Sequence, residues 1–302
     1  MNVKDVYLKT MKFNLIKLGL GAAVIGISLV LLLLCGGITF LCNNPGVTWM
    51  MILIWIVGTS ITYKLLMYYV GYMIKAAHVA VISQAVTTGQ IPENMVETGK
   101  NMVKERFVES NVYFVLDKLV SGAVKQLQKA VGAVGGALDF VPGMSSITNI
   151  LQTFIGISLG YVDECCLGYT FINKDKNAFE AGCDGVVIYF QNAKHLLKNA
   201  AVTSLIVIAS TFAISIVPLV ILLPIFGALG WNLLIAFFIA LFIAICLKTA
   251  FVDSYMLVKM MFSYMQVAPS TELSFDLYEK LCNLSNSFKK LFQKSKEKVA
   301  SL

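Results

Sequence analysis

Two long stretches without a charged residue constrain this chain more than any other feature. They are residues 18–63 and 199–247, and they contain 46 and 49 residues. A membrane-spanning helix needs about 20 consecutive apolar residues, so each stretch can hold two such helices joined by a short turn. The sequence therefore predicts an all-α, polytopic integral membrane protein. Its four transmembrane helices would form two hairpins, joined by a cytoplasmic or interfacial helical section.

The composition agrees with a membrane protein. Hydrophobic residues make up 58% of the 302 residues and charged residues only 14%, whereas about 25% of an average soluble domain is charged. The first apolar stretch is about twice as long as the apolar core of a cleavable signal peptide. We therefore expect it to be retained as the first span.

The distribution of basic residues predicts the orientation of the chain. Four lysines precede the first uncharged stretch, eleven lysines and Arg106 lie between the two stretches, and eight lysines follow the second. Because basic residues are enriched in cytoplasmic segments, we expect both termini and the middle section in the cytoplasm, with the plasma membrane as the location. Nucleic acid is not an expected partner, because the lysines are scattered along helix flanks and there is one arginine.

The pattern divides the chain into five parts. Residues 1–17 form a basic amphipathic helix, which suits anionic lipids of the inner leaflet. Residues 18–86 form the first transmembrane hairpin with a cytoplasmic extension, and residues 87–199 form a helical middle section that is partly associated with the membrane. Residues 200–266 form the second hairpin, and residues 267–302 form an amphipathic basic tail.

The middle section is open to two interpretations. Residues 112–138 place apolar side chains on one helical face, and residues 145–172 are long enough to span a membrane but include two adjacent acids. We favour a hairpin over residues 112–172 that lies on the inner side of the bundle. Two full spans are the alternative, because they also keep both chain ends on one side.

Acidic residues beside apolar helices provide the candidate site. The segment Tyr161-Val162-Asp163-Glu164 is similar to Phe251-Val252-Asp253-Ser254, and both continue to a leucine three residues later. A carboxylate beside bilayer-length helices is a functional-site hypothesis, and aromatic faces attract organic cations. The candidate substrate-binding residues are Asp163, Asp253, Tyr161, Tyr255 and Glu164. In the alternative interpretation these acids pair with lysines, such as Lys118, Lys125, Lys248 and Lys259, at the inner interface.

The two halves of the chain are similar in layout. Each has a basic lead-in, an uncharged hairpin and a tryptophan at the start of the second span. Trp49 and Trp231 are 182 residues apart, as are Lys12 and Lys194. Repeats of this kind are common in transporters, with sites near the repeat interface, although any two hairpins with basic flanks share these features. We also expect Trp49 and Trp55 at the outer membrane interface, where aromatic side chains gather.

One family resemblance bears on function. Residues 184–193, Asp-Gly-Val-Val-Ile-Tyr-Phe-Gln-Asn-Ala, lead into a predicted span, and the last span ends in Phe251-Val252-Asp253 with Leu257 after it. Over residues 184–284 this arrangement resembles the late spans of the choline transporter-like family. The resemblance implies transport of choline or a similar organic cation.

No motif indicates an enzyme, a metal site or a cofactor. The sequence has no phosphate-binding loop, no metal-ligand spacing and no nucleophile elbow, and its seven cysteines suit reduced, packed thiols. The expected function is transport or permeation of a small organic cation. The alternative is a non-catalytic membrane scaffold that binds a partner through its cytoplasmic helices. Because four spans make a small bundle, we expect a homo-oligomer or a membrane partner besides the lipid bilayer.

Overall fold

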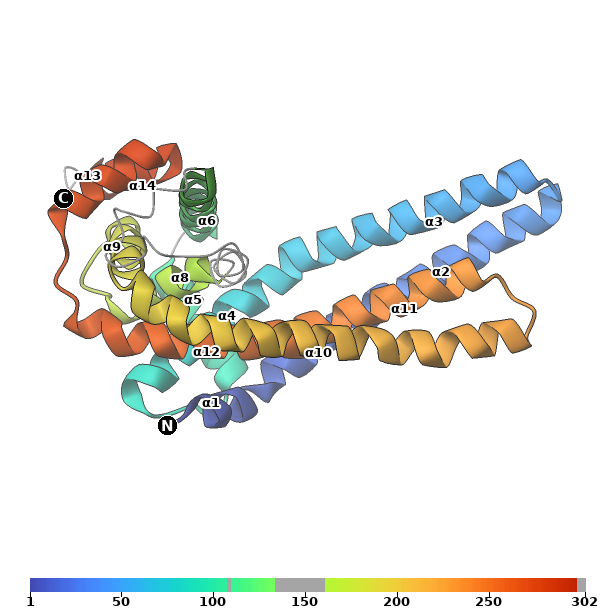
Figure 1. The fold of residues 1–302 in the computed structure, drawn as a ribbon, viewed down its shortest axis with the longest axis horizontal. Coiled ribbons are helices and arrows are strands. Elements are labelled where there is room, and N and C mark those ends of the chain that lie inside the picture. Colours follow the sequence, from blue (N-terminus) through green and yellow to red (C-terminus); the bar gives the residue numbers. More distant parts are fainter. Residues whose placement is uncertain (108–109, 134–160, 298–302) are drawn as a thin grey trace. The chain divides into compact units, whose positions relative to one another are not determined.

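The fold is helical in a computed structural model, which describes residues 1–107, 110–133 and 161–297. No β-strand occurs among these residues. The elements, named as in Figure 1, are α1 (Val3–Lys9), α2 (Met11–Cys42), α3 (Pro45–Leu66), the π-helical segment η1 (Met67–Gly71), α4 (Tyr72–Thr88), α5 (Met95–Arg106), α6 (Ser110–Ala133), α8 (Val162–Ile172), α9 (Ala178–Gln191), α10 (Ala193–Ala228), α11 (Leu233–Leu247), the π-helical segment η3 (Lys248–Val252), α12 (Asp253–Val267), the 3₁₀ segment η4 (Ala268–Ser270), α13 (Phe275–Leu284) and α14 (Asn286–Glu297).

The chain forms two compact units. Unit 1 comprises Met1–Thr10, Ala76–Ile206 and Tyr255–Leu302, and unit 2 comprises Met11–Lys75 and Val207–Ser254. Their boundaries fall inside α4, α10 and α12, which each contribute residues to both units.

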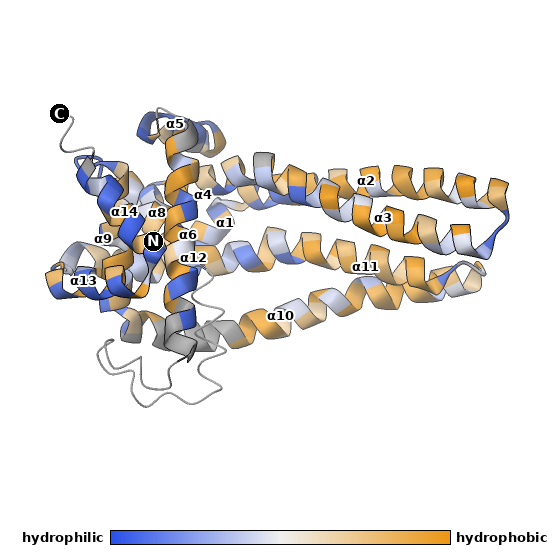
Figure 2. Cartoon of the chain, turned by 90° about the horizontal axis from the view of Figure 1, so that it is seen from above, coloured by the Kyte–Doolittle hydropathy of each residue, from blue (hydrophilic) through white to orange (hydrophobic). Residues whose placement is uncertain are grey.

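Four helices in the described part of the chain are long and apolar enough to cross a membrane. They cover Met11–Cys42, Pro45–Leu66, Leu205–Ala228 and Leu233–Ser270, and Figure 2 shows hydrophobic residues along α2, α3, α10 and α11. At most 28% of the most apolar window of each helix is buried. So much exposed apolar surface is unfavourable in water and indicates a membrane protein.

An asparagine caps the N-terminus of α3 and of α11, the two helices of unit 2 that follow the turns. The Asn44 side chain accepts a hydrogen bond from the Gly46 N–H at 2.8 Å, with Pro45 in the first helical turn. The Asn232 side chain accepts from the Leu234 N–H at 2.8 Å, after Gly230 with a φ of 66°. Such caps satisfy donors that a helix start leaves open, and glycine adopts a positive φ at little cost.

Trp55 joins three helices inside unit 2. Its indole Nε1 donates to the carbonyl and hydroxyl oxygens of Ser28 on α2, both at 3.0 Å. Its ring meets Phe238 and Phe242 of α11 edge-on, with centroids 6.4 and 6.2 Å away. The Trp55 side chain is 1% exposed, so it packs between helices and does not face lipid as a residue of an aromatic belt would. Trp49, by contrast, is 60% exposed.

The core of unit 1 is built around α9. Residues 181–190 of this helix are all buried, and α9 contacts α6, α8, α13 and α14. A Cβ atom at Gly185 would lie 3.0 Å from Cys166 Cα of α8, so glycine permits the close approach of these helices. The Tyr264 hydroxyl of α12 donates to the Gly185 carbonyl at 3.0 Å.

The apolar face of α6 also belongs to this core. Leu116, Val120 and Leu127 are fully buried, and α6 contacts α8, α9, α13 and α14. The predicted hairpin over residues 112–172, and its alternative of two spans, depend on residues 134–160. Those residues lie outside the described part of the chain.

Candidate functional site

The candidate residues lie in both units. Asp253 belongs to unit 2 and begins α12 directly after η3. Its Oδ1 atom accepts a hydrogen bond from Lys248 Nζ at 2.6 Å. The two side chains keep 28% and 38% of their surface exposed. Asp253 therefore has the lysine partner that the pairing interpretation anticipates, and both side chains remain partly exposed.

The other candidates belong to unit 1. Asp163 and Glu164 lie in the first turn of α8, and Tyr161 is the N-cap residue of this helix. Asp163 Oδ1 accepts the Glu164 N–H at 3.2 Å, and Glu164 is buried. Acids in a first turn interact favourably with the helix dipole. Tyr255 meets Tyr7 edge-on at a centroid distance of 5.4 Å. These contacts give Asp163 and Tyr255 local structural roles.

A π-helical segment accounts for the pairing of Lys248 with Asp253. Side chains three or four residues apart face each other on an α-helix, whereas these two residues are five apart. In a π-helix the backbone bonds join residues i and i+5, so this spacing places two side chains together. Residues 248–252 form such a segment, η3. The ion pair therefore depends on the local backbone form of η3.

A second π-helical segment lies at the corresponding place in the first half of the chain. Segment η1 begins at Met67 and η3 at Lys248, a difference of 181 residues. That value is within one residue of the 182 that separates Trp49 from Trp231. Both segments contact α2. The match supports an internal duplication, and π-helical turns inside α-helices occur frequently at functional sites.

A buried lysine of α2 contacts Ser254, the residue that follows Asp253 in the chain. Lys17 is 9% exposed, and its Nζ donates to the Ser254 hydroxyl at 2.9 Å. We call Lys17, Lys248, Asp253 and Ser254 the η3 cluster. Two lysines and one aspartate give this cluster a formal charge of +1. Any ligand of Asp253 must therefore compete with an ammonium group that is already in place.

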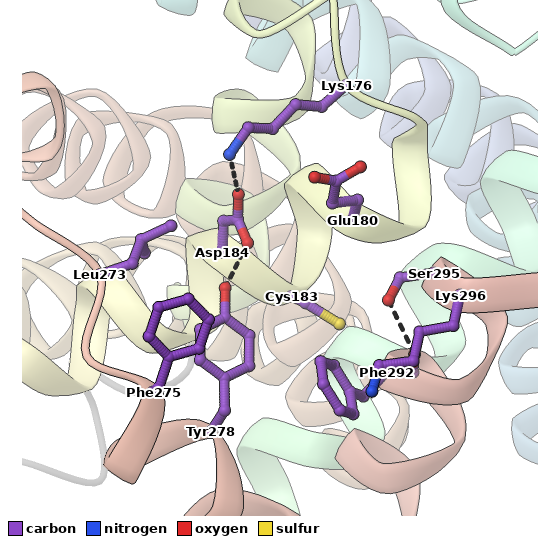
Figure 3. Close-up of a pocket in the computed structure, with 10 residues that line it drawn as sticks. All are labelled: Lys176, Glu180, Cys183, Asp184, Leu273, Phe275, Tyr278, Phe292, Ser295 and Lys296. Atoms are coloured by element: carbon purple, nitrogen blue, oxygen red, sulfur yellow. Dashed lines mark hydrogen bonds and ion pairs between the residues drawn. The ribbon is translucent and has the colours of Figure 1, made fainter. Parts of the chain in front are cut away.

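Unit 1 contains a separate cavity of about 440 Å³, shown in Figure 3. One wall comes from α9 and the loop before it, with Lys176, Glu180, Cys183 and Asp184. The other wall comes from the C-terminal segment, with Leu273, Phe275, Tyr278, Phe292, Ser295 and Lys296. The two walls are about 90 residues apart in sequence, so no local pattern predicts the cavity.

Asp184 anchors one wall of this cavity to the other. Its Oδ2 atom accepts a hydrogen bond from Lys176 Nζ at 2.5 Å, and its Oδ1 atom accepts one from the Tyr278 hydroxyl. The Asp184 side chain is 5% exposed. Arg106 holds the loop that carries Lys176, since its guanidinium donates to the Asn173 and Lys176 carbonyls at 3.1 and 2.8 Å. The buried carboxylate thus has two hydrogen-bond donors, as a buried charge requires.

Both partners of Asp184 have raised pKa values. The hydrogen bond with Asp184 raises the pKa of Lys176 above its ordinary 10.5. Burial, followed by the hydrogen bond to Asp184, raises the pKa of Tyr278 well above its ordinary 10. Folding therefore favours the protonated forms, and this stabilisation is complete below the ordinary pKa values. It is lost as the pH rises past them.

We therefore expect unit 1 to lose stability above about pH 10. Thermal unfolding followed by circular dichroism between about pH 8 and 11 measures this loss. In Tyr278→Phe the melting temperature should fall less steeply over the alkaline range, because one of the two titrating groups is gone. Equal slopes for the variant and the unmodified protein would show that Tyr278 does not contribute.

No family model, no curated protein and no solved structure matches the chain.

Proposed function

We propose that this protein is a multi-pass membrane protein that transports, or allows permeation of, a small organic cation of the choline type. The observation that carries the proposal is the Lys248–Asp253 ion pair at a π-helical interruption of a candidate span. Ionisable residues within membrane spans mark substrate and ion pathways, and interrupted helices form many transporter sites.

In this proposal the Lys248 ammonium binds Asp253 when no substrate cation is present. An isolated carboxylate at membrane depth is costly, and the Lys248 ammonium at 2.6 Å stabilises Asp253 while no cation is bound. An arriving organic cation replaces that ammonium, so Asp253 remains paired throughout the exchange. The partial exposure of both side chains lets a ligand reach the pair and lets the displaced ammonium return to water.

The arrangement in the membrane follows from the same features. The charge distribution favours cytoplasmic termini and a cytoplasmic middle section, so the two pairs of spans would form two hairpins. Matching π-helical segments in both pairs favour a parallel repeat about the membrane normal. The largely exposed apolar faces of the spans suit lipid or further copies of the chain.

The scaffold alternative has less support. It relied on the apolar face of residues 112–138 as a surface for a partner. Leu116, Val120 and Leu127 on that face are instead buried within unit 1. Over the described part of α6, this face therefore binds the protein's own helices.

Asp253→Asn is expected to abolish saturable uptake of labelled small cations, choline included, by proteoliposomes of the purified protein. The amide cannot supply the charge that pairs with the cation. Lys248→Met should instead lower the KM about tenfold, because a competing ammonium worth about 1.4 kcal/mol is removed. Lys64→Met, which alters an exposed lysine near the end of α3, is the matched control and should change neither value.

Two results would refute this proposal. One is cation uptake that persists in Asp253→Asn. The other is uptake of organic anions that depends on Lys17 and Lys248, because the η3 cluster would then act through its positive charge.

A further inference from the structure

Two neighbouring helices of unit 1, α6 and α14, present positive charge to their surroundings. Figure 2 shows hydrophilic residues on both helices. Of the side chains that the structure describes on them, the single acid, Asp117, is half-buried. Seven lysines are exposed, and we call them the lysine cluster: Lys118, Lys125 and Lys129 on α6, and Lys289, Lys290, Lys294 and Lys296 on α14.

The α6 lysines form a stripe along one side of that helix. Lys118, Lys125 and Lys129 follow one another at helical spacings of seven and four residues, which place side chains on the same face. Leu116 and Leu127, on the other side of α6, are fully buried in unit 1. The core therefore covers one side of α6 and leaves the lysine stripe outside.

Polar contacts fasten α14 beside this stripe. Gln126 Oε1 on α6 accepts hydrogen bonds from the Ser285 hydroxyl at 2.7 Å and from the Ser287 N–H at 3.0 Å. A Cβ atom at Gly122 would lie 2.8 Å from Ser287 Oγ, so the two helices approach closely there. Gly122 and Gln126 lie between the lysines of the stripe in sequence. The lysines of α6 and of α14 thus belong to adjoining helices that are fixed to each other.

The charge of the lysine cluster is not balanced within the described part of the chain. None of the seven ammonium groups lies within ion-pair distance of a described carboxylate. Lys294 and Lys296 lie over aromatic rings, 5.7 and 4.3 Å from the ring centroids, and these rings carry no net charge. The adjacent helix α13 exposes Asp276, Glu279 and Lys280, so it adds a single net negative charge. The surface therefore suits an anionic partner.

Three features favour a lipid surface over a nucleic acid. Neither helix contains an arginine, the residue that binds phosphate and bases in a fixed geometry, whereas lysine acts as a point charge that suits a diffuse layer of headgroups. Four candidate spans tether the lysine cluster to a membrane, so lipid is present at a high effective concentration. The charge distribution also favours the cytoplasmic side, where acidic lipids are enriched.

We propose that the lysine cluster binds the anionic headgroups of the membrane in which the protein resides. A group of about four to eight basic residues close to a span is typical of surfaces that bind acidic phospholipids. The attraction is electrostatic, so it requires acidic lipid and weakens as salt screens the charges. This inference concerns unit 1 and does not depend on the proposed transport function.

Amine labelling of the full-length protein in proteoliposomes tests the proposal. A membrane-permeant reagent is applied to vesicles of phosphatidylcholine alone and to vesicles with about 30% phosphatidylserine, and mass spectrometry gives the labelling rate of each lysine. In the acidic vesicles the rates of the lysine cluster should fall about fivefold at low salt and recover in about 1 M sodium chloride. Lys100 and Lys104 are the reference, because α5 exposes them together with the acids Glu97 and Glu105. Their rates should change less than about twofold.

Paired substitutions extend the test. Lys290→Gln combined with Lys294→Gln should reduce the protection of the remaining cluster lysines from about fivefold to about twofold. Lys100→Gln combined with Lys104→Gln removes the same charge from α5 and should leave the protection of the cluster unchanged. All four side chains are exposed, and labelling in phosphatidylcholine vesicles shows whether each variant keeps the fold of the unmodified protein.

Equal labelling of the lysine cluster in the two kinds of vesicle would overturn the proposal. Protection that persists in about 1 M salt would overturn it as well, because the contact would not then be electrostatic. Polyuridylate and polyglutamate are offered separately to the detergent-purified protein at about 0.15 M salt. If either one protects the lysine cluster while acidic vesicles do not, the partner is a nucleic acid or an acidic protein instead.

Discussion

Asp184→Ala is expected to destabilise unit 1 by about 3 kcal/mol, because it removes the acceptor of two hydrogen-bond donors. The Tyr278 hydroxyl would remain buried without its present acceptor, and Lys176 would lose its ion pair. Removal of one member of a fully buried pair costs about 3–5 kcal/mol, and the value here is at the lower end since Lys176 is 32% exposed and can turn to water.

Hydrogen exchange at the α9 amides measures this effect locally. All three tryptophans, Trp49, Trp55 and Trp231, belong to unit 2, so tryptophan fluorescence would report the wrong unit. Amide protection across residues 181–190 should fall by about 100-fold in Asp184→Ala. Asp175→Asn, which changes an exposed acid in the loop before α9, is the control. A loss in Asp184→Ala no greater than in this control would show that the Asp184 hydrogen bonds do not hold the unit together.

The four long apolar helices could be predicted from sequence because their signal is local. An uncharged stretch of bilayer length needs no knowledge of tertiary contacts, and the structure places four apolar helices across residues 11–270. The position of Trp55 could not be predicted in this way. Its partners, Ser28 and Phe242, lie on two other helices, and a tryptophan near a span end has the same local pattern whether it faces lipid or another helix.

At the candidate sites, too, contacts between different parts of the fold could not be predicted from local sequence patterns. Sequence indicated Asp253, but its pairing with Lys248 depends on a π-helical turn, for which the residues give no clear signal. Asp184 appeared in the family resemblance, whereas its partner Tyr278 lies 94 residues further along the chain. Packing of α9 against the C-terminal helices brings these groups together, and a single sequence does not specify such long-range packing.

Trp55→Ala is expected to destabilise unit 2 by about 3 kcal/mol, at the lower end of the usual range for truncation of a buried tryptophan. The substitution leaves a cavity between α2, α3 and α11 and removes both indole hydrogen bonds to Ser28. Ser28 keeps its 2.8 Å hydrogen bond with Thr59. Helix association within a membrane depends on close packing and hydrogen bonds rather than on the exclusion of water, so most of the loss comes from those two contributions.

Thermal unfolding in detergent, followed by circular dichroism, should show a lower melting temperature for Trp55→Ala. Trp55→Phe retains a ring against Phe238 but lacks the indole donor, and it should lose about 1 kcal/mol. Trp49→Ala removes the same side chain from a position that is 60% exposed and should change the melting temperature little. If Trp49→Ala and Trp55→Ala lower it equally, Trp55 does not join the three helices, and α11 must be held against α2 by other contacts, such as the close approach of Gly21 to Cys246.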